Sequence, residues 1–413
     1  MNACLINIGD ELLIGQVVNT NASWIAAELE KNNIHVAHIV TISDDFNDIT
    51  QTLTEALARA EIVIITGGLG PTKDDITKTA LCDYFGMQLV MHEPSLTNVV
   101  DYFTARGLQV SAVNQKQGLV PDGCEPLVNK VGTAPGMWFE RDGKVVVSLP
   151  GVPFEMQWLM HEYVLPKLQQ RLGTEAILHK TVLTCGIGES FLADIIEEWE
   201  MALPDNFRLA YLPEAGKVRL RLSAHGEDKA LLQRQMNEQI AKLVPFIDTY
   251  IYGYDDDTFA TVVGKLLIER SETIATAESC SGGHLGHRIT EVAGASTYYL
   301  GGVIAYANHI KEELLGVHKD TLEHYGAVSA QTAEEMAKGC RRLFQTDYAI
   351  ATTGISGPTG GTDEKPLGTV WIAIASKNEV ISKKYLFRTT RTQHQERTVN
   401  QALFDFWYYL THL

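Results

Sequence analysis

Residues 62–77 read Ile-Val-Ile-Ile-Thr-Gly-Gly-Leu-Gly-Pro-Thr-Lys-Asp-Asp-Ile-Thr, which is an apolar run, a glycine-rich turn and the start of a helix. Two similar apolar runs precede it at 5–8 and 35–41, and helical patterns at 20–31 and 46–60 fill the spaces between them. Strands that alternate with helices in this way form parallel sheets covered by helices. We therefore predict an α/β fold for the first part of the chain.

The pattern changes twice further along the chain. A strand at 144–148 and a helix at 154–172 close the first part. Between 176 and 252 the order is strand, helix, two alternating strands and helix, which indicates a small α+β module. An acidic linker at 254–257 leads to a second βα-rich unit, which closes with a helix at 396–410. We predict three domains, over residues 1–172, 173–253 and 254–413.

The composition limits the classes of function. With 413 residues, of which 45% are hydrophobic, the chain can build several hydrophobic cores. Its formal net charge of −17 should repel a polyanion, so we expect no nucleic-acid partner. A glycine-rich loop can still bind a small phosphorylated ligand through its backbone N–H groups.

Cysteine usage and hydropathy indicate the compartment. The six cysteines form no CxxC pair and no Cys/His cluster, so we expect reduced thiols and neither a disulfide framework nor structural zinc. The first residues lack the basic region of a signal peptide. No apolar run approaches the roughly 20 residues that span a bilayer. We expect a cytoplasmic protein with no membrane partner.

A serine in the last domain lies where a nucleophile is needed. Residues 276–284 read Thr-Ala-Glu-Ser-Cys-Ser-Gly-Gly-His, after an apolar strand and before a helical run. Ser279 should therefore lie beside the free N–H groups of a first helical turn, which could form an oxyanion hole. The alternative is that Ser279 only caps the helix, which is the commoner role of a serine at this position.

Ser279 needs a base, and the sequence shows no Ser/His/Asp arrangement. Residues 301–311 read Gly-Gly-Val-Ile-Ala-Tyr-Ala-Asn-His-Ile-Lys, a strand that ends near Tyr306 and a helix that carries Lys311. A lysine can activate a serine when burial or a neighbouring cation lowers its pKa, and Tyr306 could relay or orient the proton. From spacing alone, a solvated lysine and a tyrosine at the core edge are the simpler interpretation.

A loop rich in Gly, Ser and Thr follows another apolar strand. Residues 352–369 read Thr-Thr-Gly-Ile-Ser-Gly-Pro-Thr-Gly-Gly-Thr-Asp-Glu-Lys-Pro-Leu-Gly-Thr. Such a loop costs conformational entropy and packs little, which favours a ligand role. Its N–H and hydroxyl groups could hold a phosphate and a ribose. The alternative is a long flexible connection.

The glycine-rich turn of the first domain offers a second candidate site. Its N–H groups can bind a pyrophosphate, while Asp74 and Asp75 can hold a divalent cation. Asp10 and Glu11 also follow a strand, so both acidic pairs should lie at the same edge of the sheet. The loops 132–136 and 150–155 are further candidates there. The alternative is a tight turn whose aspartates complement a helix dipole.

Four stretches in the last domain together carry a resemblance to a known family. The sequences at 276–283, 306–317, 326–329 and 354–362 resemble the C-terminal domain of the CinA family, which is similar to nicotinamide-nucleotide amidases. The resemblance implies hydrolysis of nicotinamide mononucleotide to nicotinate mononucleotide and ammonia. It implies that Ser279 is the nucleophile and that Tyr306 and Lys311 activate it.

The same resemblance implies an arginine from the start of the last helix. Family members often carry several arginines there, whereas this chain has Arg391-Thr-Gln-His-Gln-Glu-Arg397. Arg391 and Arg397 match two of them, and Gln395 replaces another. Both arginines are therefore candidates for the active site.

The first 170 residues resemble the N-terminal CinA domain, which is similar in fold to molybdopterin-biosynthesis binding domains. This implies hydrolysis of ADP-ribose at its pyrophosphate with a divalent ion of the Mg, Co or Mn class, whereas the amidase site should need no cofactor. The middle part resembles the family's KH-like domain. Its Gly186-Ile-Gly-Glu189 has an acidic residue where an RNA-binding GxxG loop is basic, so we expect a structural module in a homodimer.

The sequence thus predicts a bifunctional enzyme of pyridine-nucleotide salvage. The alternatives are an adaptor protein for competence or recombination, and an N-terminal domain that binds a pterin or transfers adenylyl groups. The substrate-binding residues predicted for the amidase site are Glu278, Cys280, Ser281, Gly282, Gly283, Thr353, Gly354, Ser356, Gly357, Gly360, Gly361 and Thr362. Those of the N-terminal site are Gly67, Gly68, Gly70, Thr72, Gly132, Thr133, Pro135 and Gly136, with Asp74, Asp75, Asp10 and Glu11 as metal ligands.

Overall fold

A computed structural model describes residues 1–72, 75–172, 176–214 and 216–412 of the chain. The chain divides into two compact units. One contains residues 1–179, 203–208 and 222–241, and the other contains residues 180–202, 209–221 and 242–413. Asp74 and the domain boundary predicted near residue 173 lie outside the described residues.

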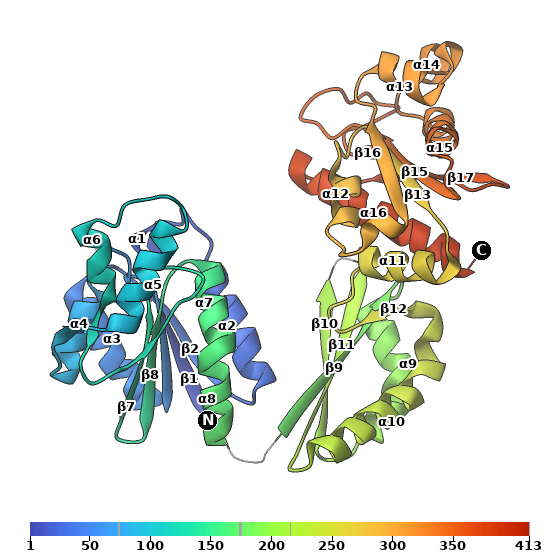
Figure 1. Ribbon diagram of the computed structural model, residues 1–413. Helices are drawn as coiled ribbons and strands as arrows, with labels where there is room; N and C mark the ends of the chain where they lie inside the picture. The colour runs from blue at the N-terminus through green and yellow to red at the C-terminus, as the bar shows by residue number, and fades with distance from the viewer. Residues whose placement is uncertain (73–74, 173–175, 215, 413) are drawn as a thin grey trace. The chain divides into compact units, whose positions relative to one another are not determined.

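The first domain is built on a six-stranded mixed sheet in the order β2-β1-β3-β8-β7-β6 (Figure 1). Four strands are parallel, which confirms the predicted α/β class; they are β1 (Asn2–Ile8), β2 (His35–Ile42), β3 (Ile62–Thr66) and β8 (Lys144–Leu149). The sequence did not predict the two antiparallel strands at the edge, which are β7 (Gly136–Arg141) and β6 (Glu125–Leu127). Antiparallel edge strands are common on otherwise parallel sheets.

Helices cover both faces of this sheet. Successive strand residues point to opposite faces, so Leu5 of β1 packs in a core with α2 and α7, whereas Ile6 packs in a second core with α3 and α4. Figure 1 shows these two pairs of helices on opposite sides of the strands. The helices and minor strands are α1 (Asp10–Leu13), α2 (Thr20–Lys31), α3 (Phe46–Arg59), α4 (Thr77–Phe85), β4 (Leu89–Met91), α5 (Glu93–Thr104), α6 (Ala112–Gln115), β5 (Leu119–Pro121), α7 (Pro153–Leu159) and α8 (Leu165–Leu172).

The middle module has a sheet in the order β10-β11-β9-β12 and two helices. The acidic stretch predicted as a linker begins inside this module, because Tyr254 ends β12 and the Asp255 N–H donates to Thr181 O at 2.8 Å. The elements are β9 (Ala176–Cys185), α9 (Glu189–Met201), β10 (Phe207–Glu214), β11 (Lys217–Gly226), α10 (Lys229–Ile247) and β12 (Ile251–Tyr254).

The last domain is again α/β, with a sheet in the order β14-β13-β15-β16-β17. β13, β14 and β15 are parallel, and β16 and β17 continue the sheet antiparallel. The elements are α11 (Phe259–Arg270), β13 (Ile274–Glu278), α12 (His284–Thr290), β14 (Tyr299–Ile304), α13 (Asn308–Leu315), α14 (Lys319–Tyr325), α15 (Ala330–Phe344), β15 (Tyr348–Gly354), β16 (Thr369–Ala375), β17 (Val380–Leu386) and α16 (Arg391–His412).

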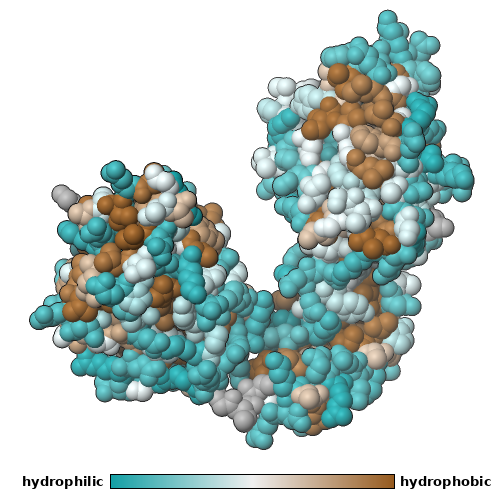
Figure 2. Space-filling view, in the orientation of Figure 1, coloured by the Kyte–Doolittle hydropathy of each residue, from teal (hydrophilic) through white to brown (hydrophobic). Residues whose placement is uncertain are grey.

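Alternate residues of β13 again point into two cores. Ile274 packs with α11 and α16, whereas Ala275 packs with α15 on the other face. Hydrophilic residues cover much of the visible surface of each part (Figure 2), in line with the net charge of −17. None of the helices in the described ranges is both long and apolar enough to cross a bilayer.

Candidate active site

Ser279 lies directly after β13, at the carboxyl end of the parallel strands of the last domain. Its backbone N–H donates to Thr352 O at 2.9 Å, which extends the pairing of β13 with β15. The chain then turns through Gly282 and Gly283, whose φ angles of 64° and 97° would strain a larger residue. Gly283 is the N-cap of α12, and the first N–H groups of this helix donate to the Glu278 carboxylate, so helix capping does not explain Ser279.

Lys311 reaches Ser279 from α13. It is only 1% exposed, and its Nζ lies 3.2 Å from Ser279 Oγ, 2.6 Å from Ala305 O and 3.4 Å from Tyr306 O. Burial lowers the pKa of Lys311 below its ordinary value. The solvated lysine considered from the spacing is therefore wrong: Lys311 is a buried group in contact with the candidate nucleophile.

The three partners of Lys311 suit a neutral amine. A neutral amine has two N–H groups and one lone pair, and the carbonyl oxygens of Ala305 and Tyr306 can only accept. The lone pair then faces Ser279 Oγ and can take the hydroxyl proton. After the transfer, the three N–H groups of the ammonium still find three acceptors. The site can therefore hold Lys311 in either protonation state.

The carboxylate of Glu278 organises the turn after Ser279. It is 2% exposed and accepts hydrogen bonds from Ser281 Oγ at 2.7 Å and from the N–H groups of Gly283, Leu285 and Gly286 at 2.9, 3.0 and 2.8 Å. Both carboxylate oxygens are used in this way. Glu278 therefore holds the loop, in place of the substrate contact predicted for it.

Two amides remain for an oxyanion. The N–H groups bound by Glu278 cannot serve, whereas those of Cys280 and Ser281 donate to no backbone carbonyl within the described ranges. They directly follow the nucleophile, as donors to a tetrahedral intermediate often do. The Cys280 side chain is buried, and burial raises its pKa to about 12, so it contributes as a thiol. The predicted contacts of Cys280 and Ser281 are thus available through their backbones.

Tyr306 and Arg391 meet at the rim of the site. The Tyr306 hydroxyl accepts a hydrogen bond from Arg391 Nη2 at 2.8 Å, and Arg391 Nη1 donates to Gly357 O at 3.0 Å. Tyr306 is 58% exposed, and its contact with Lys311 is made by its carbonyl group. A direct proton relay by the Tyr306 hydroxyl is therefore not seen in this arrangement, and its hydroxyl is oriented by Arg391.

The loop between β15 and β16 borders a cavity of about 1000 Å³. Thr353 and Gly354, which were predicted to bind substrate, do not line this cavity. They belong to β15, and the buried Thr353 hydroxyl donates to Ala327 O at 2.6 Å. Arg388, which was not among the predicted site residues, also lines the cavity. The predicted residues that line it are Ser356, Gly357, Gly360, Gly361 and Thr362, together with Arg391.

The first turns of α16 connect three loops of this site. Arg391 contacts the β15–β16 loop and Tyr306, while Gln395 Nε2 donates to Cys280 O at 3.3 Å. His394, which the sequence did not single out, is fully buried and lies 3.0 Å from Ser356 Oγ. The helix was predicted to start at 396, five residues late, because its first turn is polar and shows no apolar periodicity.

In the first domain, the predicted loops meet at the carboxyl end of the parallel strands. A Cβ at Gly67 would lie 2.2 Å from Ile8 O, and a Cβ at Gly151 would lie 3.5 Å from Gly67 Cα. A Cβ at Gly68 would lie 2.1 Å from Thr77 Oγ1. The glycine-rich turn therefore allows close packing of the loops after β1, β3 and β8, as the sequence predicted.

The acidic residues of this edge are spread over several loops. The Asp75 carboxylate lies beside Gly70 and accepts hydrogen bonds from the Thr72 N–H, at 2.9 Å, and the Thr72 hydroxyl. The Asp10 N–H donates to Asp44 Oδ2 at 3.2 Å; Asp44, on the loop after β2, was not predicted. The Glu11 carboxylate lies beside Gly9.

The described residues bring no three His, Cys, Asp or Glu side chains together as a metal site would require, and Asp74 is not among them. A magnesium ion commonly needs only one or two carboxylates when substrate phosphates supply the remaining ligands. One or two of the carboxylates of Asp75, Asp10 and Glu11 would fit that kind of donor set, which is not an all-protein cage.

The predicted loop 132–136 is only partly open. Pro135 and Gly136 are buried and Gly136 begins β7, so they offer little open surface, and their ligand role stays a prediction. Thr133 is half-buried. A Cβ at Gly132 would lie 2.0 Å from Glu155 Oε2, which also accepts from Asn129 Nδ2 at 2.5 Å. Glu155 therefore orders this loop.

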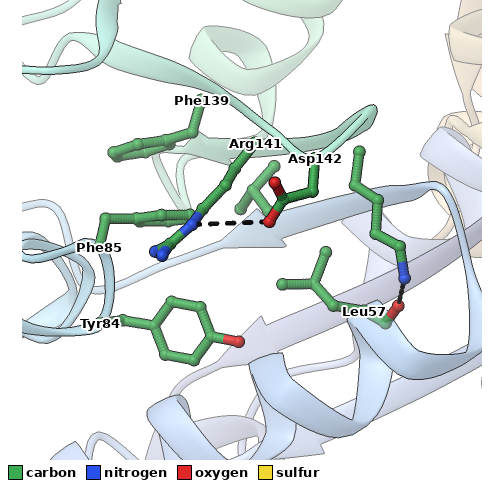
Figure 3. Close-up of a pocket in the computed structure, with 8 residues that line it drawn as sticks. Leu57, Tyr84, Phe85, Phe139, Arg141 and Asp142 are labelled. Atoms are coloured by element: carbon green, nitrogen blue, oxygen red, sulfur yellow. Dashed lines mark hydrogen bonds and ion pairs between the residues drawn. The ribbon is translucent and has the colours of Figure 1, made fainter.

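A separate cavity of about 520 Å³ lies beside the β7–β8 turn (Figure 3). Phe85 and Phe139 stack along it with ring centroids 4.7 Å apart, and Arg141 pairs with Asp142. Lys144, at the start of β8, also lines this cavity. The cavity therefore lies away from the other end of β8, which is near the glycine-rich turn. Among the residues that the structure describes, none of the predicted site residues borders it.

The chain is similar to known proteins over almost its whole length. A CinA-like protein of Cytophaga hutchinsonii is 46% identical over 396 residues, which cover 96% of this chain and 95% of that protein. A CinA-like protein of Flavobacterium psychrophilum is 46% identical over 408 residues, covering 98% and 97%. The chain belongs to the CinA family.

Family models match all three parts of this CinA-family chain. Residues 4–170 match a "Probable molybdopterin binding domain", residues 179–253 a "Damage-inducible protein CinA KH domain", and residues 256–409 the "CinA C-terminal domain". The resemblances drawn from the sequence are therefore confirmed at the level of family and fold. The crystal structure of a competence/damage-inducible protein from Agrobacterium tumefaciens is 36% identical, covers 37% of this chain and 94% of that one, and gives a TM-score of 0.36.

The geometry distinguishes between Arg391 and Arg397, the two candidates for the active-site arginine. Arg391 contacts Tyr306 and the β15–β16 loop. Arg397 is exposed, and in the described part of the chain no hydrogen bond connects it to Ser279, Tyr306 or Lys311. Arg391 is therefore the arginine that the structure brings to the site.

Proposed function

We propose that the C-terminal domain hydrolyses the carboxamide of nicotinamide mononucleotide to nicotinate mononucleotide and ammonia. The proposal depends mainly on one observation: buried Lys311 lies 3.2 Å from Ser279 Oγ, and its other two acceptors are backbone carbonyls. Within the described residues Lys311 has no carboxylate partner, whereas it is well placed to deprotonate a serine.

The proposed reaction begins with transfer of the Ser279 proton to the lone pair of Lys311. Ser279 Oγ attacks the carboxamide carbon, and the Cys280 and Ser281 N–H groups stabilise the oxyanion. The intermediate then expels ammonia, which takes its proton from the Lys311 ammonium and leaves an ester on Ser279. Water attacks this ester, Lys311 accepts the water proton, and the departing Ser279 oxygen recovers it. Nicotinate mononucleotide is released.

The cavity beside Ser356 is suited to the rest of the nucleotide. Arg388 and Arg391 supply positive charge to it, and the N–H groups of Gly360 and Gly361 lie in the same loop. A guanidinium group binds phosphate well because its N–H groups match two phosphate oxygens. We place the 5′-phosphate in this cavity and the carboxamide near Ser279.

Incubation of the full chain with nicotinamide mononucleotide tests the proposal. We expect ammonia and nicotinate mononucleotide in equal amounts, without added metal and with EDTA present. A Lys377→Ala variant, changed at an exposed lysine of the β16–β17 turn, is the matched control for variants of Lys311. The proposal fails if the folded chain releases no ammonia above the uncatalysed rate.

For the first domain we propose metal-dependent cleavage of the ADP-ribose pyrophosphate. The supporting observation is that the Gly67 and Gly68 turn, Asp75, and the Asp10–Asp44 contact all lie on loops after neighbouring strands. One or two of the carboxylates of Asp75, Asp10 and Glu11, together with the substrate phosphates, would hold the ion of the Mg, Co or Mn class, which would neutralise phosphate charge. AMP release from ADP-ribose with added metal tests this activity.

Other parts of the proposal concern assembly and partners. We propose a homodimer, in which the KH-like module is structural, and sedimentation of the purified chain tests it. An adaptor function in competence or recombination would require a nucleic-acid or protein partner in place of a small-molecule substrate. The net charge of −17 opposes a DNA partner, so we retain the two small-molecule substrates.

A further inference from the structure

His394 is a fully buried histidine in the first turn of α16. Its Nδ1 lies 3.0 Å from Ser356 Oγ, and its Nε2 lies 3.3 Å from Gly368 O. Its ring packs against Phe387 with centroids 6.1 Å apart. His394 therefore connects the beginning and the end of the loop that borders the candidate nucleotide cavity.

The partners of His394 determine its tautomer. Gly368 O is a carbonyl oxygen and can only accept, so Nε2 must carry the proton in that hydrogen bond. Burial, opposed by the bond to Gly368 and assisted by the nearby Arg391 charge, lowers the pKa of His394. The ring is therefore neutral near pH 7, and its Nδ1 carries a lone pair.

This tautomer fixes the direction of the next hydrogen bond. Because Nδ1 can only accept, the Ser356 hydroxyl must donate its single proton to His394. The oxygen of Ser356 then has lone pairs but no proton for any other partner. Ser356 also lines the cavity beside Arg391.

We propose that His394 is a positioning residue which makes Ser356 a hydrogen-bond acceptor, so that the site selects a substrate group that donates an N–H or O–H. This inference rests on the proposed amidase function. Two groups of nicotinamide mononucleotide offer such a donor: the carboxamide N–H and a ribose hydroxyl. The carboxylate of the product offers none at the position of the amide.

Protonation of His394 reverses the arrangement. A charged ring has N–H groups on both nitrogens, so Ser356 would accept from Nδ1 and turn its proton towards the ligand. The groups that face the ring are Ser356, Gly368 O and Phe387, and Arg391 is the nearby charge that opposes protonation. Substrate affinity should therefore fall as the pH drops through the lowered pKa of His394.

The tautomer can be measured without any activity. Long-range ¹H–¹⁵N spectra of the full chain with ¹⁵N-labelled histidine should show His394, assigned by its loss in His394→Asn, as a neutral ring protonated on Nε2 at pH 7. A ring protonated on Nδ1, or on both nitrogens, overturns the proposal. Since this measurement needs no substrate, its result is independent of whether the chain is an amidase.

Binding of two ligands tests the role of Ser356. On a Ser279→Ala background, which does not turn over the substrate, Ser356→Ala should raise the dissociation constant of nicotinamide mononucleotide by calorimetry about tenfold, as expected for loss of one hydrogen bond. If nicotinate mononucleotide binds as in the wild type, the donor is the carboxamide; if it weakens equally, the donor is a ribose hydroxyl. Unchanged binding of both ligands overturns the proposal.

A pair of His394 variants separates positioning from packing. In His394→Asn the side-chain oxygen can replace the Nδ1 acceptor, whereas His394→Leu offers no acceptor. We expect KM for nicotinamide mononucleotide to rise several-fold more in the leucine variant, with a smaller change in kcat. The acid-side rise of KM should disappear in both variants. Equal KM values in the two variants, or a rise of KM at low pH that persists in both, would contradict the positioning role of His394.

Discussion

The burial and the contacts of Lys311 determine its protonation state, and no local sequence pattern reveals them. The sequence identified Ser279, Tyr306 and Lys311 through a resemblance, and the structure brings Lys311 to Ser279 while the Tyr306 hydroxyl bonds to Arg391. Burial is the main reason that the pKa of Lys311 is lowered. A lysine in this state gains or loses its proton closer to neutral pH than a solvated one.

The lowered pKa predicts the pH dependence of the amidase. Below that pKa Lys311 is an ammonium and cannot accept the Ser279 proton, so kcat/KM should rise with pH until Lys311 is neutral. Lys311→Ala should remove nearly all turnover, and Lys311→Arg should not restore it because a guanidinium stays protonated. Lys377→Ala should retain wild-type turnover. A flat profile of kcat/KM between pH 5 and 10 would contradict this role.

The contacts of single polar residues were the hardest feature to predict. Nothing near Glu278 in the sequence indicates that its carboxylate accepts four hydrogen bonds, because three of the donors are backbone groups of a turn whose path is set by Gly282 and Gly283. His394 and Asp44 were missed for a similar reason. Their partners lie far away in sequence, and a single histidine or aspartate has no local signature.

At the scale of secondary-structure elements, α16 and the turn after β13 hold the site together. The predicted helix began at 396, whereas α16 begins at Arg391, and the missed turn contains the contacts to Tyr306 and Ser356. The β7–β8 hairpin did have a signal. Asp142 and Gly143 have φ angles of 51° and 76°, and an Asp-Gly pair between apolar runs is typical of a two-residue hairpin. The four-residue β12 is too short to predict from alternation.

The Glu278 carboxylate should stabilise the turn that carries Ser279. In Glu278→Gln an NH₂ group replaces one acceptor oxygen and faces N–H groups that it cannot bind. We expect the free energy of unfolding to fall by about 2 kcal/mol and kcat to fall further than KM changes. Denaturant unfolding and steady-state kinetics measure both effects.

The control for this change is Glu291→Gln, because the Glu291 side chain is 46% exposed and pairs only with Arg288 and His287 in the described structure. An exposed ion pair contributes little, so this variant should be close to wild type. The account of the turn is wrong if Glu278→Gln and Glu291→Gln have the same stability and kcat.

At the scale of the whole molecule, the family and the α/β class of both outer domains were readable from the sequence. Alternating apolar strands and helices predicted the two sheets, and their parallel strands place the candidate loops of each domain at one edge. The two proposed sites belong to different compact units. Changes at one site should therefore leave the other chemistry intact.

Asp75→Asn should remove AMP release from ADP-ribose and leave ammonia release from nicotinamide mononucleotide within about twofold, since separate sites behave additively. Chelation with EDTA should have the same selectivity. Asp83→Asn, at an exposed position of α4, is the control and should retain both activities. The assignment of the metal to the first domain is wrong if EDTA stops the amidase and spares ADP-ribose cleavage.

The acidic charge of the molecule predicts weak contact with nucleic acids. A chain of net charge −17 should show no binding to duplex or single-stranded DNA at 50 mM salt, where phosphate contacts are strongest. A fluorescence titration at several salt concentrations measures this. Tight binding with a steep salt dependence would favour the adaptor alternative over the enzyme.

Turnover of nicotinamide mononucleotide by Ser279→Ala tests the central claim most directly. We expect this variant to fold like the wild type, by its circular dichroism and unfolding transition, and to release ammonia at less than about one thousandth of the wild-type rate, because a nucleophile and its base act as one unit. A correctly folded Ser279→Ala protein whose rate stays within a few-fold of wild type would contradict the account.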